Sequence, residues 1–112
     1  MRLTYCYNTT PLGILEKTPN GYKYTSDVRN EQRLKEKRIL SNMTYSLWNS
    51  CGEESSELFP DIERVLDETR ENTLEMAGVT PQDSKWDKLV KVAQLRAFPS
   101  GFYLQVTRMY EN

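Results

Sequence analysis

The chain has 112 residues, 38% of them hydrophobic and 28% charged, with a net charge of -1; this composition predicts one folded domain, residues 1–112, that needs neither metal nor disulfide support. The near-neutral charge does not favour direct nucleic-acid binding, and there is no run of about 18 apolar residues that could span a membrane. The N-terminal residues also lack the continuous apolar core of a signal peptide, so we expect a cytoplasmic protein without membrane association.

Three short strands are predicted at the N-terminus. Residues 3–7 alternate between two faces and are rich in the β-branched and aromatic residues that favour strands. Residues 12–17 continue as an extended segment, in which Gly13 predicts either a β-bulge or a close backbone approach. The Thr-Pro-Asn-Gly sequence at 18–21 is typical of a tight turn, and 22–26 follows as the third strand. Together these segments predict an antiparallel meander.

A charged helix is predicted next, over residues 28–38, with Ser26 or Asp27 as its N-cap. It contains five basic and two acidic residues. Only three apolar residues could face a core, namely Val28, Leu34 and Ile39. We therefore expect this helix at the edge of the domain, mostly in solvent.

The residues between this helix and the next carry weaker signals. Within 39–48, Met43, Tyr45 and Leu47 alternate with polar residues, which would suit a fourth strand. Residues 49–56 are rich in Ser, Gly and Glu, and this composition predicts a loop.

The longest predicted helix covers residues 58–79, and we expect the rest of the chain to pack around it. Pro60 suits the first turn, and Gly78 supplies the left-handed residue that follows the last turn. Residues at three- and four-residue spacing predict one buried stripe on a helix about 27 Å long. The stripe comprises Leu58, Ile62, Val65, Leu66, Thr69, Thr73, Met76 and Ala77. The opposite side is mainly acidic.

A shorter helix and a strand complete the predicted elements. Ser84 and Asp87 form a capping box for a helix that extends to about Leu95. Residues 98–101 then end the helix, and 102–109 alternates as a closing strand. The pattern predicts an α+β fold, in which the N-terminal three-stranded meander and the C-terminal strand form an antiparallel sheet with helices packed on one face.

The side chains offer few routes to catalysis. The sequence contains no histidine, which removes imidazole acid-base chemistry and His-ligated metals. Cys6 and Cys51 lack metal-ligand spacing, and we expect both to be reduced thiols. The five glycines are scattered and do not form a phosphate-binding loop. We therefore expect that the protein is not an enzyme and that it has no catalytic residue, cofactor or bound metal. The sequence does not favour a small-molecule ligand either.

Uneven charge and two aromatic residues are the positive signals. Residues 53–75 hold nine acidic and two basic side chains, whereas 29–38 and 85–96 are basic. The acidic residues either balance the basic helices within the fold or steer association with a basic partner. Trp48, beside a polar loop, and Phe59, before a helix, either pack internally or contact a partner. The candidate partner-binding residues are Trp48, Phe59, Glu63, Glu68 and Glu71.

Four short features occur in a suggestive order along the chain. They are Gly13-Ile14-Leu15 in the second strand, Tyr22-Lys23-Tyr24 in the third, Leu58-Phe59-Pro60 before a helix, and Ala77-Gly78-Val79 at its end. Together they resemble the N-terminal subdomain of the HipA family of Ser/Thr kinases and the small stand-alone proteins that correspond to it in three-component versions of that system. The charged helix over 28–38 departs from the family, which usually has a Ser-, Leu- and Pro-rich extended stretch there.

The resemblance implies a fold and a general role. In that family the subdomain has no catalytic residues, packs on the kinase body and, as a separate protein, restrains the kinase toxin. It implies a non-enzymatic regulatory module, an antitoxin-like bacterial partner of a HipA-type kinase. The alternative is a small acidic inhibitor of phage or plasmid type, directed at a nucleic-acid-binding enzyme such as a nuclease. Its acidic residues would imitate phosphates, and its binding would weaken steeply with salt.

Overall fold

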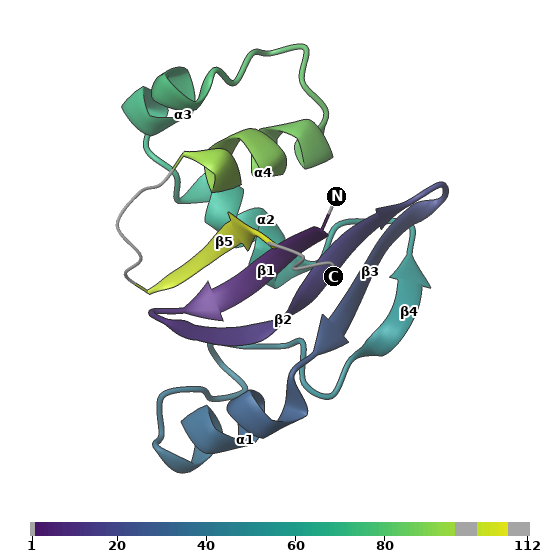
Figure 1. The fold of residues 1–112 in the computed structure, drawn as a ribbon, viewed down its shortest axis with the longest axis vertical. Coiled ribbons are helices and arrows are strands. Elements are labelled where there is room, and N and C mark those ends of the chain that lie inside the picture. Colours follow the sequence, from purple (N-terminus) through teal and green to yellow (C-terminus); the bar gives the residue numbers. More distant parts are fainter. Residues whose placement is uncertain (1, 96–100, 108–112) are drawn as a thin grey trace, which may run out of the picture.

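The computed structural model describes residues 2–95 and 101–107, which form a five-stranded antiparallel sheet and four helices (Figure 1). The strands are β1 (Arg2–Tyr7), β2 (Thr10–Thr18), β3 (Gly21–Ser26), β4 (Cys51–Ser55) and β5 (Phe102–Val106). The helices are α1 (Val28–Glu36), α2 (Pro60–Asp67), α3 (Glu71–Ala77) and α4 (Lys85–Gln94). The α+β class and the N-terminal meander are therefore confirmed.

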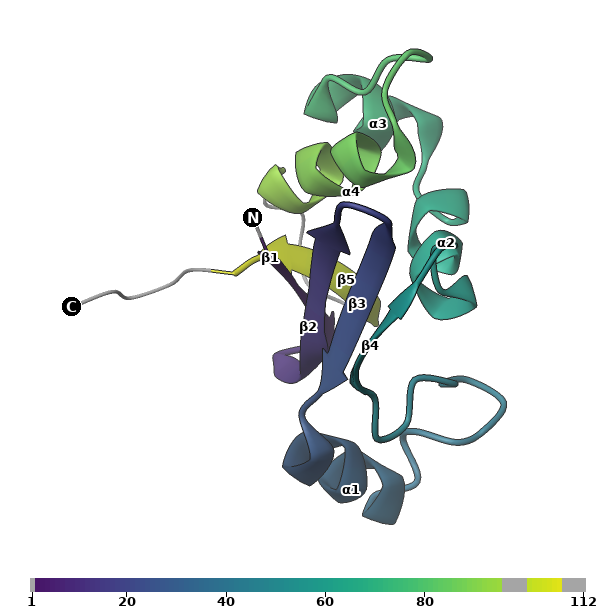
Figure 2. The same ribbon diagram turned by 90° about the vertical axis from the view of Figure 1, so that its right-hand side faces the viewer.

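The strand order of the sheet is β4-β3-β2-β1-β5, and the helices lie on one of its faces and at the two ends of its strands. Helix α2 lies behind the sheet in Figure 1 and to its right in Figure 2. Helix α1 lies at one end of the strands, and α3 and α4 lie at the other end (Figures 1 and 2). None of the described helices covers the opposite face. Within this part of the chain, no helix is both long and apolar enough to cross a membrane.

The core lies between the sheet and α2. Leu3 on β1 pairs with Leu15 on β2, and both are fully buried together with Tyr5. Ile62 from α2 and Leu89 from α4 belong to the same cluster. Burial of each such aliphatic side chain contributes about 1.5–3 kcal/mol relative to an exposed position. The cluster therefore holds both helices against the sheet.

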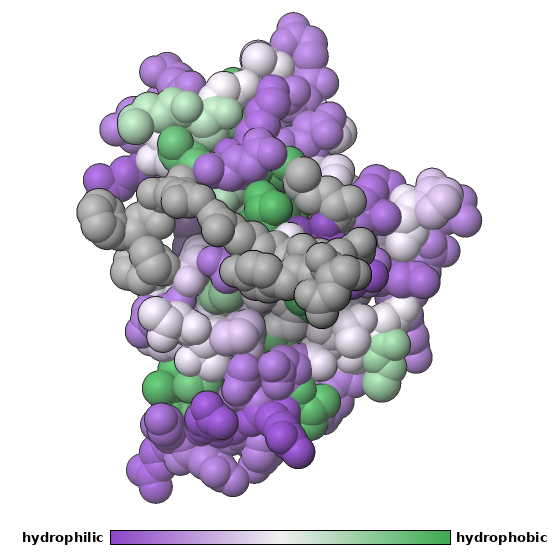
Figure 3. Space-filling view, viewed as in Figure 1, coloured by the Kyte–Doolittle hydropathy of each residue, from purple (hydrophilic) through white to green (hydrophobic). Residues whose placement is uncertain are grey.

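The expected helix ends are largely correct. Asp27 caps α1 by accepting a hydrogen bond from the amide three residues later (3.1 Å), and Ser84 caps α4 in the same way (3.1 Å). Pro60 is the first residue of α2, and Gly78 ends α3 with a φ of 79°. Helix α1 lies at the edge as expected, and hydrophilic residues dominate its surface in Figure 3.

The closing strand is confirmed as β5. It pairs with β1 and places Phe102, Leu104 and Val106 on one face, opposite Tyr7, Tyr5 and Leu3. The predicted break at 98–100 and the predicted strand residues 108–109 lie outside the described residues. Both cysteines are free thiols, as expected; Cys6 is buried on β1 and Cys51 is exposed on β4.

The fourth strand that the ambiguous residues 39–48 would suit does not form there, and the loop predicted at 49–56 is wrong. The strand that pairs with β3 is β4, and the residues before it follow an irregular path. Tyr45 and Leu47 are buried there, but Met43 is 92% exposed. Two of the three alternating apolar side chains therefore anchor this segment in the core, and the three do not form one face of a sheet. The polar β4 forms a strand because an edge strand needs a backbone partner on one side only.

The single helix predicted over 58–79 is also wrong, because the chain breaks between α2 and α3. The Thr69 hydroxyl donates to the Val65 carbonyl (2.6 Å), which a continuous helix reserves for the Thr69 amide. That amide donates to the Leu66 carbonyl (3.1 Å), and the next residue is extended at φ -66° and ψ 146°. The break lets α3 pack against α4 (Figure 1), so Met76, expected in the buried stripe, is 73% exposed.

Both structural features expected at Gly13 are present. The register of β1 and β2 shifts between Tyr5 and Cys6, directly opposite Gly13, which is the predicted bulge. A Cβ atom at Gly13 would collide with the ring of Tyr24 and the carbonyl of Thr25, which is the predicted close approach. Glycine is therefore required here for space.

Gly13→Ala should lower the free energy of unfolding by about 1–3 kcal/mol, because the added methyl group forces the Tyr24 ring or the β3 backbone to move. Urea unfolding followed by circular dichroism measures this change. Gln32→Ala, at an exposed position on α1, is the control and should change stability by less than about 0.5 kcal/mol. Equal stabilities for the two variants would show that a Cβ atom at Gly13 does not collide with Tyr24 and Thr25.

Candidate functional site

The segment between α1 and β4, residues 37–50, is held by two buried carboxyl groups. Asp61, which is 2% exposed, accepts a hydrogen bond from the amide of Ser46 (2.7 Å). Glu31, which is 1% exposed, accepts one from the amide of Asn49 (3.1 Å). Side chains of α1 and α2 thus hold the segment, together with Ser26 on β3, whose hydroxyl donates to the Leu47 carbonyl (2.8 Å) and accepts from the Ser50 amide (2.8 Å).

Glu31 also ends a chain of buried hydroxyl groups. The Tyr45 hydroxyl donates to Glu31, and the Tyr24 hydroxyl lies 3.0 Å from that of Tyr45. Tyr5 stacks on Tyr45 with ring centroids 6.4 Å apart and an interplanar angle of 10°. Burial raises the pKa of Tyr5, Tyr24 and Tyr45 far above the usual tyrosine value. These three phenols therefore stay neutral at physiological pH and can donate hydrogen bonds.

Sequence reasoning missed the two buried acids. It counted Glu31 among the charges of a helix expected mostly in solvent, and Asp61 among the nine acidic residues of 53–75. A signal was present for Glu31, which lies three residues from both Val28 and Leu34 and so falls within the sparse apolar stripe. Asp61 directly precedes the core residue Ile62, but an acid next to a core position does not by itself predict burial.

Trp48 is partly exposed at the end of the 37–50 segment. Its ring packs edge-on against Tyr45, with centroids 4.8 Å apart and an interplanar angle of 87°. The Lys35 ammonium lies 5.7 Å from the centroid of the Trp48 ring, which is cation-π distance. The indole Nε1 is buried, and no described residue accepts a hydrogen bond from it. Trp48 is therefore held in place while part of its ring remains accessible.

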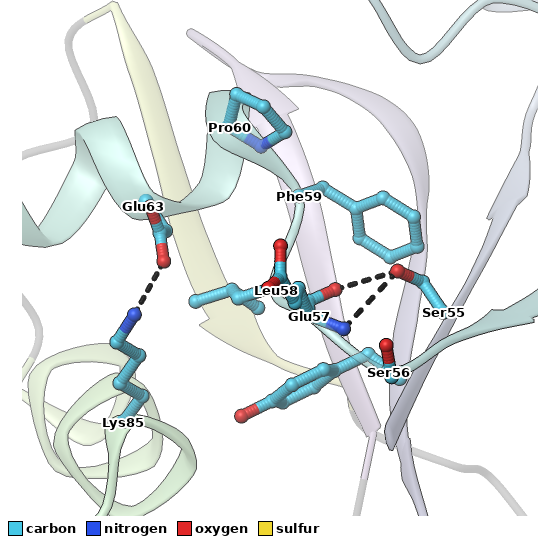
Figure 4. A pocket seen from close by; sticks show the side chains of 9 residues that line it. Ser55, Ser56, Glu57, Leu58, Phe59, Pro60, Glu63 and Lys85 are labelled. Carbon is cyan, nitrogen blue, oxygen red and sulfur yellow. Dashed lines mark hydrogen bonds and ion pairs between the residues drawn. The ribbon is translucent and has the colours of Figure 1, made fainter. Parts of the chain in front are cut away.

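Phe59 lies between two hollows that follow β4. The first, with a volume of about 260 Å³, is lined by Tyr24, Trp48, Glu53 and Phe59, among others. The second, about 520 Å³, is lined by Tyr22, Ser55, Phe59, Glu63 and Lys85, among others (Figure 4). We call these two hollows, with Phe59 between them, the β4 groove. Phe59 itself packs edge-on against Tyr24, with centroids 6.2 Å apart.

The charges around the β4 groove are mostly negative. Glu53 lines the first hollow and Glu57 the second, and both residues are exposed. Glu63 on α2 forms an ion pair with Lys85 on α4, drawn in Figure 4. The hydrogen bond and charge of Glu63 raise the pKa of Lys85. Lys85 is the only cation lining either hollow among the described residues, and it is already paired.

The structure brings together three of the five candidate residues. Trp48 and Phe59 line the first hollow, and Phe59 and Glu63 line the second. Glu68, at the end of α2, lines a separate hollow beside β5, and Glu71 is exposed in the first turn of α3. Glu68 and Glu71 lie apart from the other three because the helix breaks between α2 and α3. The single acidic face expected on one straight helix therefore does not form.

The β4 groove offers apolar surface, an acidic border and the backbone of an edge strand. Among the residues placed in the structure, no three Cys, Asp or Glu side chains gather in a way that could hold a metal ion. Comparison with protein families, with curated proteins and with solved structures returns no match for this chain. Its function is therefore inferred from its own residues and their geometry.

Proposed function

We propose that this protein is a non-enzymatic interaction module that binds another protein through the β4 groove. The observation that carries this proposal is the position of Trp48 and Phe59, two large aromatic side chains that line hollows beside an edge strand. Tryptophan contributes strongly to protein interfaces when it can be covered, and a partly exposed, immobilised ring loses little entropy on binding.

The proposed partner is a HipA-type Ser/Thr kinase, and the proposed role is antitoxin-like restraint of that kinase in the bacterial cytoplasm. Support comes from the sequence resemblance, whose segments Leu58-Phe59-Pro60 and Tyr22-Lys23-Tyr24 both line the β4 groove in part. Such a partner would present basic and apolar side chains to the acidic border at Glu53 and Glu57.

An acidic inhibitor that imitates nucleic acid has less geometric support. Glu63 is neutralised by Lys85, and Glu68 and Glu71 lie on either side of the helix break. A phosphate-like array requires several free acids in a regular row, and these three residues do not provide one. Partner binding that depends only weakly on salt would favour the interaction module over the acidic inhibitor.

Trp48→Ala and Phe59→Ala should each weaken binding to the kinase by at least about tenfold, because each removes an aromatic side chain that lines the groove. The test is co-expression with the kinase-like product of the neighbouring gene, followed by size-exclusion chromatography and titration of the purified components. Met76→Ala, which truncates an exposed apolar side chain on α3, is the matched control and should bind normally.

The alkylation rate of Cys51 gives a second measurement, which needs no substitution in the chain. It lines the first hollow and is exposed, whereas Cys6 is buried, so an alkylating reagent should label Cys51 first. A bound partner should protect Cys51 from labelling. If the chain never co-elutes with a kinase-like partner, the proposed partner is wrong; if it co-elutes but Trp48→Ala and Phe59→Ala bind normally, the proposed surface is wrong.

A further inference from the structure

The outer edge of β4 is open to another strand. In the sheet order β4 is terminal, and the described residues pair with it only through β3. An edge strand presents a row of backbone N–H and C=O groups that can accept an added strand. All five residues of β4 are at least partly exposed, so no part of the described chain buries this edge.

The register of β4 decides which side chains an added strand would meet. Ser55 lies opposite Tyr22 and Glu54 opposite Lys23, so successive residues of β4 point to opposite faces. Ser55 and Glu53 line the hollows, and Glu54 therefore lies on the other face. Side chains two residues apart on an added strand are about 6.7 Å apart on one face. Two such side chains can occupy the hollows on either side of Phe59.

The charges restrict what can bind there. Glu53, Glu54 and Glu57 lie on or next to the open edge, and the only lining cation found in the described part of the groove is Lys85, which is paired with Glu63. A second copy of this chain, paired edge to edge, would bring these glutamates close to their counterparts, which is unfavourable. A segment with apolar side chains at alternate positions and Lys or Arg between them would place its apolar groups in the hollows and its cations near Glu54.

We propose that the β4 edge binds an extended segment of the partner protein as a sixth strand of the sheet. The segment carries apolar side chains at positions i and i+2, which enter the two hollows, and Lys or Arg at the intervening positions, on the same face as Glu54. This inference rests on the proposed function, since it uses the same groove, and it adds the conformation and chemistry of the segment that binds.

The probe is a capped seven-residue peptide in which Lys alternates with Ile or Leu, titrated into the isotopically labelled full chain and followed by amide resonances and the indole N–H resonance of Trp48. Two versions N-methylated at alternate residues, on one edge or the other, are the decisive controls, because a strand pairs through only one set of its amides. One methylated version should bind at least about tenfold more weakly than the parent peptide, and the other should bind like it.

Charge reversal tests the chemistry of the segment. Glu53→Lys combined with Glu54→Lys should weaken binding of the Lys-containing peptide by about tenfold or more at low salt. Glu75→Lys, at an exposed position on α3, is the matched control and should leave binding unchanged. A peptide with Glu in place of Lys should bind the doubly reversed variant better than the original chain.

Equal binding of both N-methylated peptides, or no binding of the parent peptide at about 1 mM, would overturn strand addition. So would a stable dimer of the free chain with protected β4 amides, because a second copy would then occupy the edge. None of these results contradicts the proposed function if the kinase still co-elutes with the original chain and does not co-elute with Trp48→Ala. If the peptide binds as expected but the kinase does not co-elute, the proposed partner is wrong and the proposal of strand addition at β4 still stands.

Discussion

Above a pH of about 10 this protein should lose stability by about 4 kcal/mol for each further pH unit, and it should unfold within a few units. The cause is the buried group Tyr5, Tyr24 and Tyr45, whose pKa values are raised chiefly by loss of contact with water. In the unfolded chain these phenols ionise near their ordinary pKa.

The sign follows from the number of bound protons. Above pH 10 the folded state keeps three phenolic protons that the unfolded state has released, so raising the pH favours unfolding. Below that pH both states hold the protons, and the stabilisation is fully present. Each phenol contributes a limiting slope of about 1.4 kcal/mol per pH unit.

Tyrosinate absorbance and circular dichroism, recorded together during an alkaline titration, measure this behaviour. Absorbance from the three buried phenols should appear only as the helical signal disappears. In Tyr24→Phe the dependence of unfolding free energy on pH should be smaller by about 1.4 kcal/mol per unit. Ionisation of all tyrosines while the fold remains intact would contradict the burial of these hydroxyl groups.

Glu31→Ala should lower the free energy of unfolding by about 2–5 kcal/mol. Glu31 is buried and accepts hydrogen bonds from the Tyr45 hydroxyl and the Asn49 amide. Alanine leaves the Asn49 amide without its acceptor. If Tyr45 turns its hydroxyl to Tyr24, the Tyr24 hydroxyl becomes the unsatisfied donor. At least two donors must therefore lose or change a partner, and a cavity forms as well.

Urea unfolding at neutral pH measures this change, and Glu36→Ala is the matched control because Glu36 is exposed on the same helix. The control should change stability by less than about 0.5 kcal/mol. Glu31→Ala should also alter the fluorescence of Trp48 and the alkylation rate of Cys51, since Glu31 holds the segment that precedes β4. A loss of stability no larger than that of Glu36→Ala would show that Glu31 is accessible to water.

Local signals predicted much of the fold. The meander, the caps at Asp27 and Ser84 and the left-handed Gly78 depend on residues close together in the chain, and all are present. Gly13 was informative for the same reason, because few positions other than bulges and close approaches favour glycine within a strand.

The errors occurred where distant contacts decide the structure. β4 has no strand-like sequence, and it forms because β3 offers a free edge to its backbone. The break at Thr69 depends on α4, which provides a surface that α3 can cover only by turning. Only half of the candidate site was predictable: Trp48 and Phe59 were named as residues that either pack internally or contact a partner, but their alignment along β4 required the strand that the sequence did not indicate.

The way in which Glu31 and Asp61 hold the 37–50 segment has a consequence for its evolution and engineering. Both acids bind main-chain amides, those of Asn49 and Ser46, which every residue except proline can supply. The exposed Ser46 side chain can therefore be exchanged without redirecting the loop, whereas Asn49, at a φ of 52°, tolerates few replacements beyond Gly and Asp. Such a loop can acquire new specificity by surface substitution while its scaffold stays unchanged.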